Sequence, residues 1–252
     1  MEVITSLENK RIKEFAKLLQ KKYRDGEGKF LVEGEHLVEE AFKSGYLLEV
    51  VKCEEFERDF DVPTTYVTYD VLKKLSNVMA PQKVIGVCKK KDDKLVGNKV
   101  LLLDDIQDPG NLGTIIRSSV AFGLDTIVLS NGTVDVYNDK VIRSSEGMLF
   151  YVNVVRDDIK SVIYNLKNDG FKVYGTNVNN GEDVRNISTF SKIALVMGNE
   201  GAGVKDEILD MCDNYIYITM NKNCESLNVG VATSIILYEF YKGSFVNGED
   251  KF

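Results

Sequence analysis

Three short segments of the chain combine glycine with amide, carboxylate or guanidinium side chains. The first has the spacing N-x-G-x-x-x-R, with Asn111, Gly113 and Arg117, the second reads GNEGAG at residues 198–203, and the third reads ESLNV at 225–229. Glycine lets a backbone approach a ligand closely, and polar strand ends are the usual place for sites in open parallel sheets. Each segment alone is also compatible with a tight turn. Together they predict a binding or catalytic site.

Two common phosphate-binding motifs do not account for these glycines. Gly110 and Gly113 follow an apolar strand and open a helix, as in dinucleotide-binding folds, but their spacing is not G-x-G-x-x-G. No segment ends in the Gly-Lys-Ser/Thr of a Walker loop. The chain has a single histidine, His36, and its four cysteines form no C-x-x-C pair. We therefore expect no metal site and no His-based catalysis.

The segments are positioned by a pattern of strands and helices that begins near residue 99. Continuous apolar runs alternate with helical segments, which predicts an α/β domain whose parallel sheet is covered on both faces. Its last predicted strand, 215–220, leads through a polar loop to an apolar run at 229–241. Ser226 or Asn228 suits the N-cap of that final helix. Because the run is apolar on nearly every side, we expect a second subunit to cover one of its faces.

Residues 1–90 predict a smaller α/β domain. It opens with a basic amphipathic helix at 5–23, followed by a glycine-bearing turn at 23–29. The polar stretch 90–98 is the best linker candidate, so we place the domain boundaries at 1–95 and 96–252. The net charge of −7 argues against a nucleic-acid binder. However, two runs, 10–29 and 89–94, are rich in lysine, which is compatible with solvated faces or with a local patch facing phosphates.

The bulk composition is that of a water-soluble protein. Of its 252 residues, 44% are hydrophobic and 28% charged, which is ordinary for a globular chain. No apolar run approaches the length of a membrane span, and the first residues lack the order of a signal peptide. We expect a cytoplasmic protein with no membrane partner.

The three segments resemble the signature motifs of the SpoU (TrmH) family of RNA ribose 2′-O-methyltransferases, which belong to the SPOUT superfamily. The first motif matches at residues 108–117, the second at 195–203, and the third at 218–220 and 225–229 with Ala232. Order and spacing agree over residues 99–242. Residues 1–90 resemble the family's N-terminal substrate-binding domain through ITS at 4–6 and FLVEG at 30–34.

The resemblance implies a SPOUT-type α/β fold with a deep trefoil knot, S-adenosylmethionine as cofactor, and a homodimer. It also implies that Gly198, Ile218 and Leu227 hold the adenosyl part of the cofactor, largely by backbone groups. Met197, Gly203 and Met220 would line the same place. The reaction would be methyl transfer to a ribose 2′-hydroxyl, preceded by binding of structured RNA through the small N-terminal α/β domain.

The resemblance also implies the catalytic roles. Arg117 is the family's candidate for activating the hydroxyl, but the pKa of a guanidinium is too high for a free base. We expect it to stabilise the developing alkoxide and hold a phosphate, with pairing to a carboxylate as the alternative. Asn111 would fix Arg117 or the ribose. Glu200 would hold a site arginine or order the second loop, with acceptance of the proton as the alternative. Ser226 and Asn228 would cap the last helix and face the ribose.

Contacts to RNA are expected from Arg143 and from the N-terminal Lys10 and Arg11. Arg143 lies in a weaker family segment, 143–148, in which Glu146 and Met148 replace small or apolar residues. Thr219 likewise replaces a common proline. We favour ribosomal RNA as the substrate because of the extra N-terminal domain. The alternatives are transfer RNA as the substrate and a non-catalytic RNA-binding relative.

Overall fold

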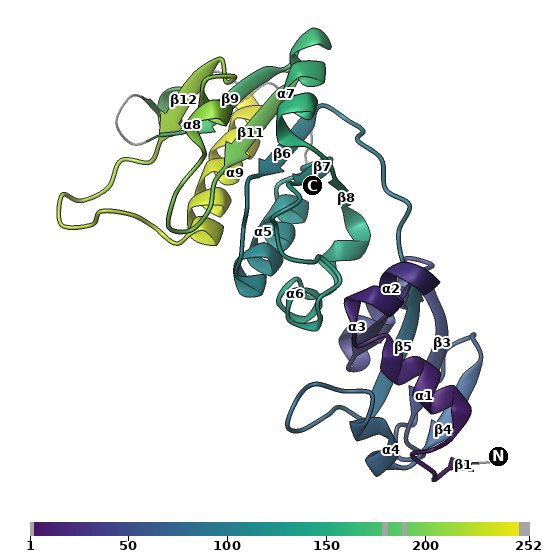
Figure 1. Ribbon diagram of the computed structural model, residues 1–252. Coiled ribbons are helices and arrows are strands. Elements are labelled where there is room, and N and C mark those ends of the chain that lie inside the picture. The colour runs from purple at the N-terminus through teal and green to yellow at the C-terminus, as the bar shows by residue number, and fades with distance from the viewer. Residues whose placement is uncertain (1–2, 178–180, 188–190, 247–252) are drawn as a thin grey trace. The chain divides into compact units, whose positions relative to one another are not determined.

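The computed structural model describes residues 3–177, 181–187 and 191–246 of an α/β chain (Figure 1). Contacts between Cα atoms divide the chain into two compact units. The first comprises Met1–Asp92 and Asp135–Tyr151, and the second comprises Asp93–Val134 and Val152–Phe252. The predicted division at residue 95 is continuous in sequence, whereas the first unit also takes in a segment from the middle of the chain.

A five-stranded mixed sheet forms the centre of the first unit, with the order β1-β4-β3-β5-β2. Strands β1, β3 and β4 are parallel, and β5 is antiparallel to β2 and β3. The strands are β1 (Val3–Ile4), β2 (Lys29–Glu33), β3 (Leu47–Lys52), β4 (Thr64–Val67) and β5 (Val84–Lys89). The helices are α1 (Lys10–Lys17), α2 (Lys21–Glu27), α3 (Glu35–Lys43), α4 (Tyr69–Lys73) and α6 (Asp139–Ser144), with the 3-10 turn η1 (Met148–Tyr151).

The single helix predicted at residues 5–23 is wrong, because the structure forms two helices there. Helix α1 starts late, since the side chain of Asn9 accepts hydrogen bonds from the backbone N–H groups of Arg11 and Ile12. An extended residue, Gln20, separates the two helices. Helix α2 then occupies most of the predicted turn and ends at Gly28, whose φ of 63° favours glycine.

Polar and aromatic contacts attach the segment Asp135–Tyr151 to the rest of the first unit. The buried guanidinium of Arg24 donates to the Asp135 carboxylate at 2.6 Å, and the Tyr151 hydroxyl donates to Glu40 at 2.7 Å. The rings of Phe30 and Tyr137 are 4.6 Å apart. These partners are about 110 residues apart in sequence, so no local pattern indicated the attachment.

The second unit contains a seven-stranded sheet with the order β10-β12-β9-β11-β6-β7-β8. All of its pairs are parallel, which confirms the predicted fold class. The strands are β6 (Lys99–Leu103), β7 (Thr126–Leu129), β8 (Asn153–Arg156), β9 (Lys172–Thr176), β10 (Glu182–Asp183), β11 (Ile193–Met197) and β12 (Asn214–Tyr217). The helices are α5 (Pro109–Ala121), α7 (Ile159–Asn168), α8 (Asp206–Leu209) and α9 (Val229–Val246), with the 3-10 turn η2 (Val184–Asn186).

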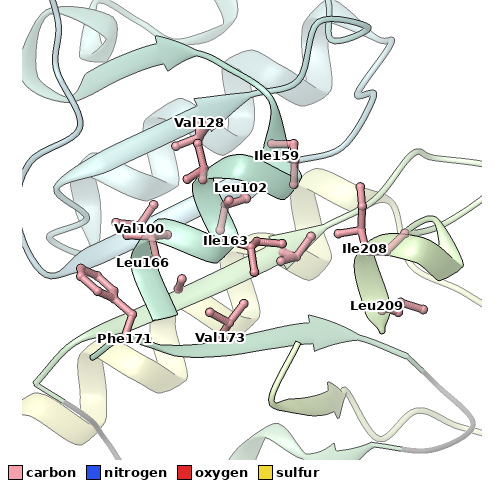
Figure 2. Packing of buried hydrophobic residues seen from close by; sticks show 14 residues of the cluster. Val100, Leu102, Val128, Ile159, Ile163, Leu166, Phe171, Val173, Ile208 and Leu209 are labelled. Atoms are coloured by element: carbon pink, nitrogen blue, oxygen red, sulfur yellow. The ribbon is translucent and has the colours of Figure 1, made fainter. Parts of the chain in front are cut away.

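Helices cover both faces of this sheet. Figure 2 shows one core, in which α7 and α8 pack on alternate residues of the central strands, such as Val100 and Leu102 of β6. Leu101 and Leu103 point to the opposite face and are equally buried. Helices α5 and α9 lie side by side in the second unit (Figure 1), joined by a 2.6 Å hydrogen bond between the hydroxyls of Ser118 and Ser234.

Candidate active site

The three motif segments follow the carboxyl ends of strands β6, β11 and β12. Strands β6 and β11 are direct neighbours, and Asp104 N donates to the carbonyl of Met197 across their ends. Strand β12 ends at Tyr217, earlier than the predicted 220, so Ile218 and Met220 belong to the loop. Parallel neighbouring strands therefore bring the three loops to one edge of the sheet.

The first loop is closed by the N-terminus of α5. The side chain of Asp108 accepts a hydrogen bond from the backbone N–H of Asn111 at 3.0 Å, and Pro109 occupies the first helical position, where a missing N–H costs nothing. This cap places the Asn111 carboxamide at the start of the helix, facing the second loop.

The Glu200 carboxylate fastens the second loop to the first. It accepts hydrogen bonds from the Asn111 side chain at 3.0 Å and from the backbone N–H groups of Asp108 and Gln107, at 3.0 and 3.2 Å. Burial acts to raise the pKa of Glu200, but the hydrogen bonds from Asn111 and the backbone outweigh it, so the pKa is lowered. A carboxylate held in this way is a poor proton acceptor.

Asn228 connects the third loop to the same point. Its side-chain oxygen accepts from the N–H groups of Gly230 and Val231 at 2.9 and 3.2 Å, so it is the N-cap of α9. Its side-chain nitrogen donates to the Asn111 oxygen at 2.8 Å. One carboxamide, that of Asn111, therefore donates to Glu200 and accepts from Asn228, and links all three motif segments.

Arg117 and Ser226 have side chains available for a ligand. Arg117 lies on the exposed side of α5 and makes no hydrogen bond or ion pair with any residue in the described part of the chain. The carboxylate pairing considered from the sequence is therefore not found among those residues. Ser226 is exposed and its hydroxyl caps nothing within the same ranges, so the cap predicted for Ser226 or Asn228 belongs to Asn228 alone.

A cavity of about 450 Å³ adjoins these loops. All six predicted cofactor residues line it, as do Glu200 and Ser226. Sequence reasoning missed other lining residues. Of these, Thr176 ends β9 and Asn177 follows it, and β9 lies next to both β11 and β12. Only the strand order could have indicated them. The missed residues of the lining also include Tyr217, Ala232 and Ile236.

Glycine is required at two positions in the wall of this cavity. A Cβ atom on Gly198 would lie 2.0 Å from the carbonyl carbon of Gly203, and Gly203 itself has a φ of 73°. Asn199 and Gly203 exchange two backbone hydrogen bonds of 3.0 Å, while the side chain of Asn199 accepts from the N–H of Gly201 at 2.9 Å. The wall is thus a tight, self-bonded turn.

An ion-paired lysine fixes the far end of the same loop. The ammonium of Lys205 lies 3.0 Å from the Asp104 carboxylate and 2.5 Å from that of Asp105. The hydrogen bonds that Lys205 donates to Asp105 and, to a smaller extent, to Asp104 raise the pKa of Lys205. The bond to Asp105 in turn lowers the pKa of that carboxylate. Asp104 is almost completely buried, so the pair ties the loop to the end of β6.

The three residues predicted to contact RNA lie in the first unit. Lys10 is exposed and has no partner within the described ranges. The Arg11 guanidinium donates to Glu49 at 2.7 Å, and that of Arg143 donates to Asp139 at 2.8 Å. Thr219, where the family often has proline, donates through its hydroxyl to the buried carboxylate of Asp183.

Two further structural findings concern only the described residues. Within them, no three or more His, Cys, Asp or Glu side chains are grouped so that they could hold a metal ion. None of their helices is both long and apolar enough to cross a membrane.

The fold and the linked motifs define a class of protein, and comparison with known families identifies it. Residues 98–238 match the SpoU rRNA Methylase family, and residues 9–86 match the MRM3-like substrate binding domain. The chain belongs to the SpoU rRNA methylase family, which confirms the resemblance found in the sequence.

Individual relatives agree with this assignment. The chain is 42% identical over 244 residues to the 23S rRNA (guanosine(2553)-2′-O)-methyltransferase RlmP of Bacillus subtilis, covering 94% of this chain and 98% of the relative. The AdoMet-bound rRNA methyltransferase of Sinorhizobium meliloti superposes with a TM-score of 0.85 at 29% identity, over 96% of this chain and 97% of that one. The SpoU methyltransferase AviRb of Streptomyces viridochromogenes, in complex with AdoMet, gives 0.82 at 27%, over 94% and 98%.

Proposed function

We propose that this protein transfers the methyl group of S-adenosylmethionine to a ribose 2′-hydroxyl of ribosomal RNA in the cytoplasm. The observation that carries the proposal is the Asn111 carboxamide, which joins Glu200 and Asn228 beside the 450 Å³ cavity. The RlmP relative modifies a guanosine of 23S rRNA by name, at 42% identity over nearly the whole chain. We therefore propose a guanosine of 23S rRNA as the target.

The cavity has the size and chemistry that S-adenosylmethionine requires. Its volume lies within the usual range for small-molecule sites. Met197, Ile218 and Leu227 offer apolar surface for an adenine ring, and the turn around Gly198 offers backbone groups at close range. When bound, the cofactor supplies an electrophilic methyl group on a sulfonium.

The residues of the chain must position the ribose and stabilise charge on its oxygen. Transfer would exchange the bond between sulfur and the methyl carbon for a bond between the 2′-oxygen and that carbon, and the proton of the hydroxyl would pass to solvent water. Arg117 has no competing partner among the described residues, and its fixed positive charge would stabilise the developing alkoxide or an adjacent phosphate. Ser226, with a free hydroxyl at the cavity, would hydrogen-bond to the ribose.

Glu200 would act by holding the site together. Its hydrogen bonds to Asn111, Asp108 and Gln107, together with its lowered pKa, favour this role over that of the proton acceptor. Asn111 and Asn228 would then orient the start of α5, and with it Arg117. Preorganisation of this kind can supply a large part of the rate of a group transfer.

A homodimer would explain the apolar surface that α5 and α9 leave uncovered. On α9, Val231 and Tyr238 are 46% and 50% exposed, and the rings of Tyr238 and Tyr241 pack on Phe122 of α5. A two-fold axis through this surface would bury it against its own copy. Sedimentation should show a dimer that Val231→Asp with Tyr238→Asp converts to monomer. A monomeric native protein would refute the assembly.

We also propose that the loops around β11 and β12 form the trefoil knot expected of the superfamily. The strand order is compatible with this, because β11 is inserted between β6 and β9, which both precede it in the chain. A crystal structure that traces the backbone through residues 176–228 would test the threading directly.

The decisive experiment for the function is methyl transfer from tritium-labelled S-adenosylmethionine to unmodified RNA. We expect label in 23S rRNA, at one nucleotide whose 3′ phosphodiester resists alkali. Label in transfer RNA alone would favour the other substrate class. Normal cofactor binding without transfer to any bacterial RNA would refute catalysis and leave an RNA-binding protein.

A further inference from the structure

Two basic runs that are far apart in sequence meet at one end of the sheet in the first unit. Lys29 begins β2 and Lys89 ends β5, and the two residues are direct partners in the antiparallel register. The backbone N–H of Lys90 also donates to the carbonyl of Gly28 at 2.7 Å. Directly paired residues of an antiparallel sheet point to the same face. The side chains of Lys29 and Lys89 are therefore neighbours.

Neither lysine is neutralised within its unit. Lys21 and Lys90 both bind the Asp25 carboxylate, but Lys29 and Lys89 form no ion pair with any residue in the described ranges. Like charges placed directly opposite each other destabilise a sheet. A lysine on an edge strand can prevent unwanted strand pairing, which would explain Lys29 on β2. It does not explain Lys89, because β5 lies between β2 and β3.

Aromatic rings stabilise the lysines of this sheet end without removing their charge. The ammonium of Lys89 lies 5.4 Å from the centre of the Tyr46 ring, and that of Lys91 lies 6.0 Å from it. The Tyr46 ring also stacks on Phe150, with 5.7 Å between centres. Because the Tyr46 ring is already in contact with two lysines and Phe150, this surface recognises RNA through positive charge on phosphates and not through stacking of bases.

We propose that the basic sheet end, defined by Lys29, Lys89 and Tyr46, binds backbone phosphates of the RNA substrate. The proposal rests on the RNA substrate given under the proposed function and assigns that RNA a docking surface. The two unpaired lysines form it better than Arg11, whose charge is already used by Glu49. A bound phosphate would relieve the repulsion between the two lysines. The paired lysines therefore lower the stability of the free protein and raise its affinity for RNA.

The test compares the native protein with a double variant that carries both Lys29→Gln and Lys89→Gln. Binding to in vitro transcribed, unmodified bacterial 23S rRNA is measured without cofactor at several salt concentrations. Loss of two phosphate contacts should lower the slope of log affinity against log salt by about 1.4 to 1.8. Affinity at low salt should fall severalfold, and the dissociation constant for S-adenosylmethionine should not change. The thermal midpoint should stay the same or rise, because a repulsion is removed.

The matched control is Lys43→Gln with Lys73→Gln, which removes the same charge from lysines of the same unit that are paired with Glu39 and Asp70. The control should leave the salt slope of RNA binding as in the native protein. Equal effects in both double variants, or native RNA affinity in the Lys29 and Lys89 variant, would overturn the proposal. Because RNA binding is measured separately from methyl transfer, an inactive native protein would refute the proposed reaction without deciding the docking surface.

Discussion

The Asn111 carboxamide shows what single residues contribute to this site. It has one donor group and one acceptor group directed at two different motifs, so no apolar residue and no carboxylate could replace it. A side chain with only acceptors would repel Glu200, and one with only donors would leave the amide of Asn228 without its acceptor. The residue fits its position because an amide carries both functions.

Replacement of Arg117 tests the catalytic role at the same scale. Arg117→Ala should lower kcat by about 100-fold to 1,000-fold, as removal of one charge-stabilising donor does in other enzymes. Arg117→Lys should recover part of the loss. The measurement is tritium transfer to 23S rRNA under saturating substrates. Cofactor affinity, followed by calorimetry, should be unchanged, since Arg117 does not line the cavity. A kcat within threefold of the native value would contradict the role.

The roles of Ser226 and Asn228 can be distinguished by the conformational stability of their alanine variants. Asn228→Ala removes the N-cap of α9, which typically costs about 1 kcal/mol, and also the bond to Asn111. We expect a lower midpoint of chemical denaturation together with reduced kcat. Ser226→Ala removes a hydroxyl without a partner in the described ranges. It should leave stability unchanged while kcat falls, and a Ser226→Ala variant with full activity would exclude the hydroxyl from the reaction.

The loop after β11 sets the shape of the cofactor cavity at the scale of an element. A Cβ atom on Gly198 would meet backbone at 2.0 Å, whereas one on Gly201 would lie 3.7 Å from the Asn199 side chain, an ordinary contact. Gly198→Ala should therefore displace the wall and weaken cofactor binding by more than tenfold. Gly201→Ala, the matched control, should bind nearly as the native protein does. Calorimetric titration with S-adenosylmethionine measures both, and equal affinities would contradict the requirement for glycine.

The sequence predicted this element and its neighbours well because the signals are local. An apolar run followed by GNEGAG marks the end of β11, and Asp108 with Pro109 marks the start of α5. The sequence predicted strand bounds and cavity-lining residues less well where tertiary contacts determine them. Strand β12 ends three residues before its apolar pattern does, and β10 is only two residues long. The cavity lining from β9 depended on strand order, which no single segment encodes.

At the scale of the whole molecule, the first compact unit is not one continuous stretch of the sequence, as its composition had suggested. The polar stretch after residue 90 looks like a boundary, but Asp135–Tyr151 returns to the first unit. This segment carries Arg143, so a residue expected to contact RNA lies in the same unit as the basic sheet end. The attachment depends on pairs of residues that are distant in sequence, and these can be recognised only in three dimensions.

Removal of the ion pair between Arg24 and Asp135 tests that attachment most directly. The guanidinium is buried, donates to the carbonyls of Leu18 and Leu19 at 3.0 and 2.9 Å, and binds Asp135 at 2.6 Å. Its Nε has no hydrogen-bond partner among the described residues, so the surroundings of Arg24 satisfy only part of its guanidinium. Arg24→Met would leave the Asp135 carboxylate, 15% exposed, without its counter-charge. We expect a loss of about 3 kcal/mol in the free energy of unfolding.

A second substitution separates the lost pair from general damage. Asp135→Asn in the Arg24→Met background removes the unpaired charge, so it should recover part of the stability, whereas Asp135→Asn alone should be destabilising. Urea denaturation of the four proteins gives the coupling energy of the cycle. Because both side chains of the pair are largely buried, the coupling should be large even at high salt, where exposed ion pairs are screened. Additive effects would mean that this ion pair does not hold Asp135–Tyr151 in the first unit.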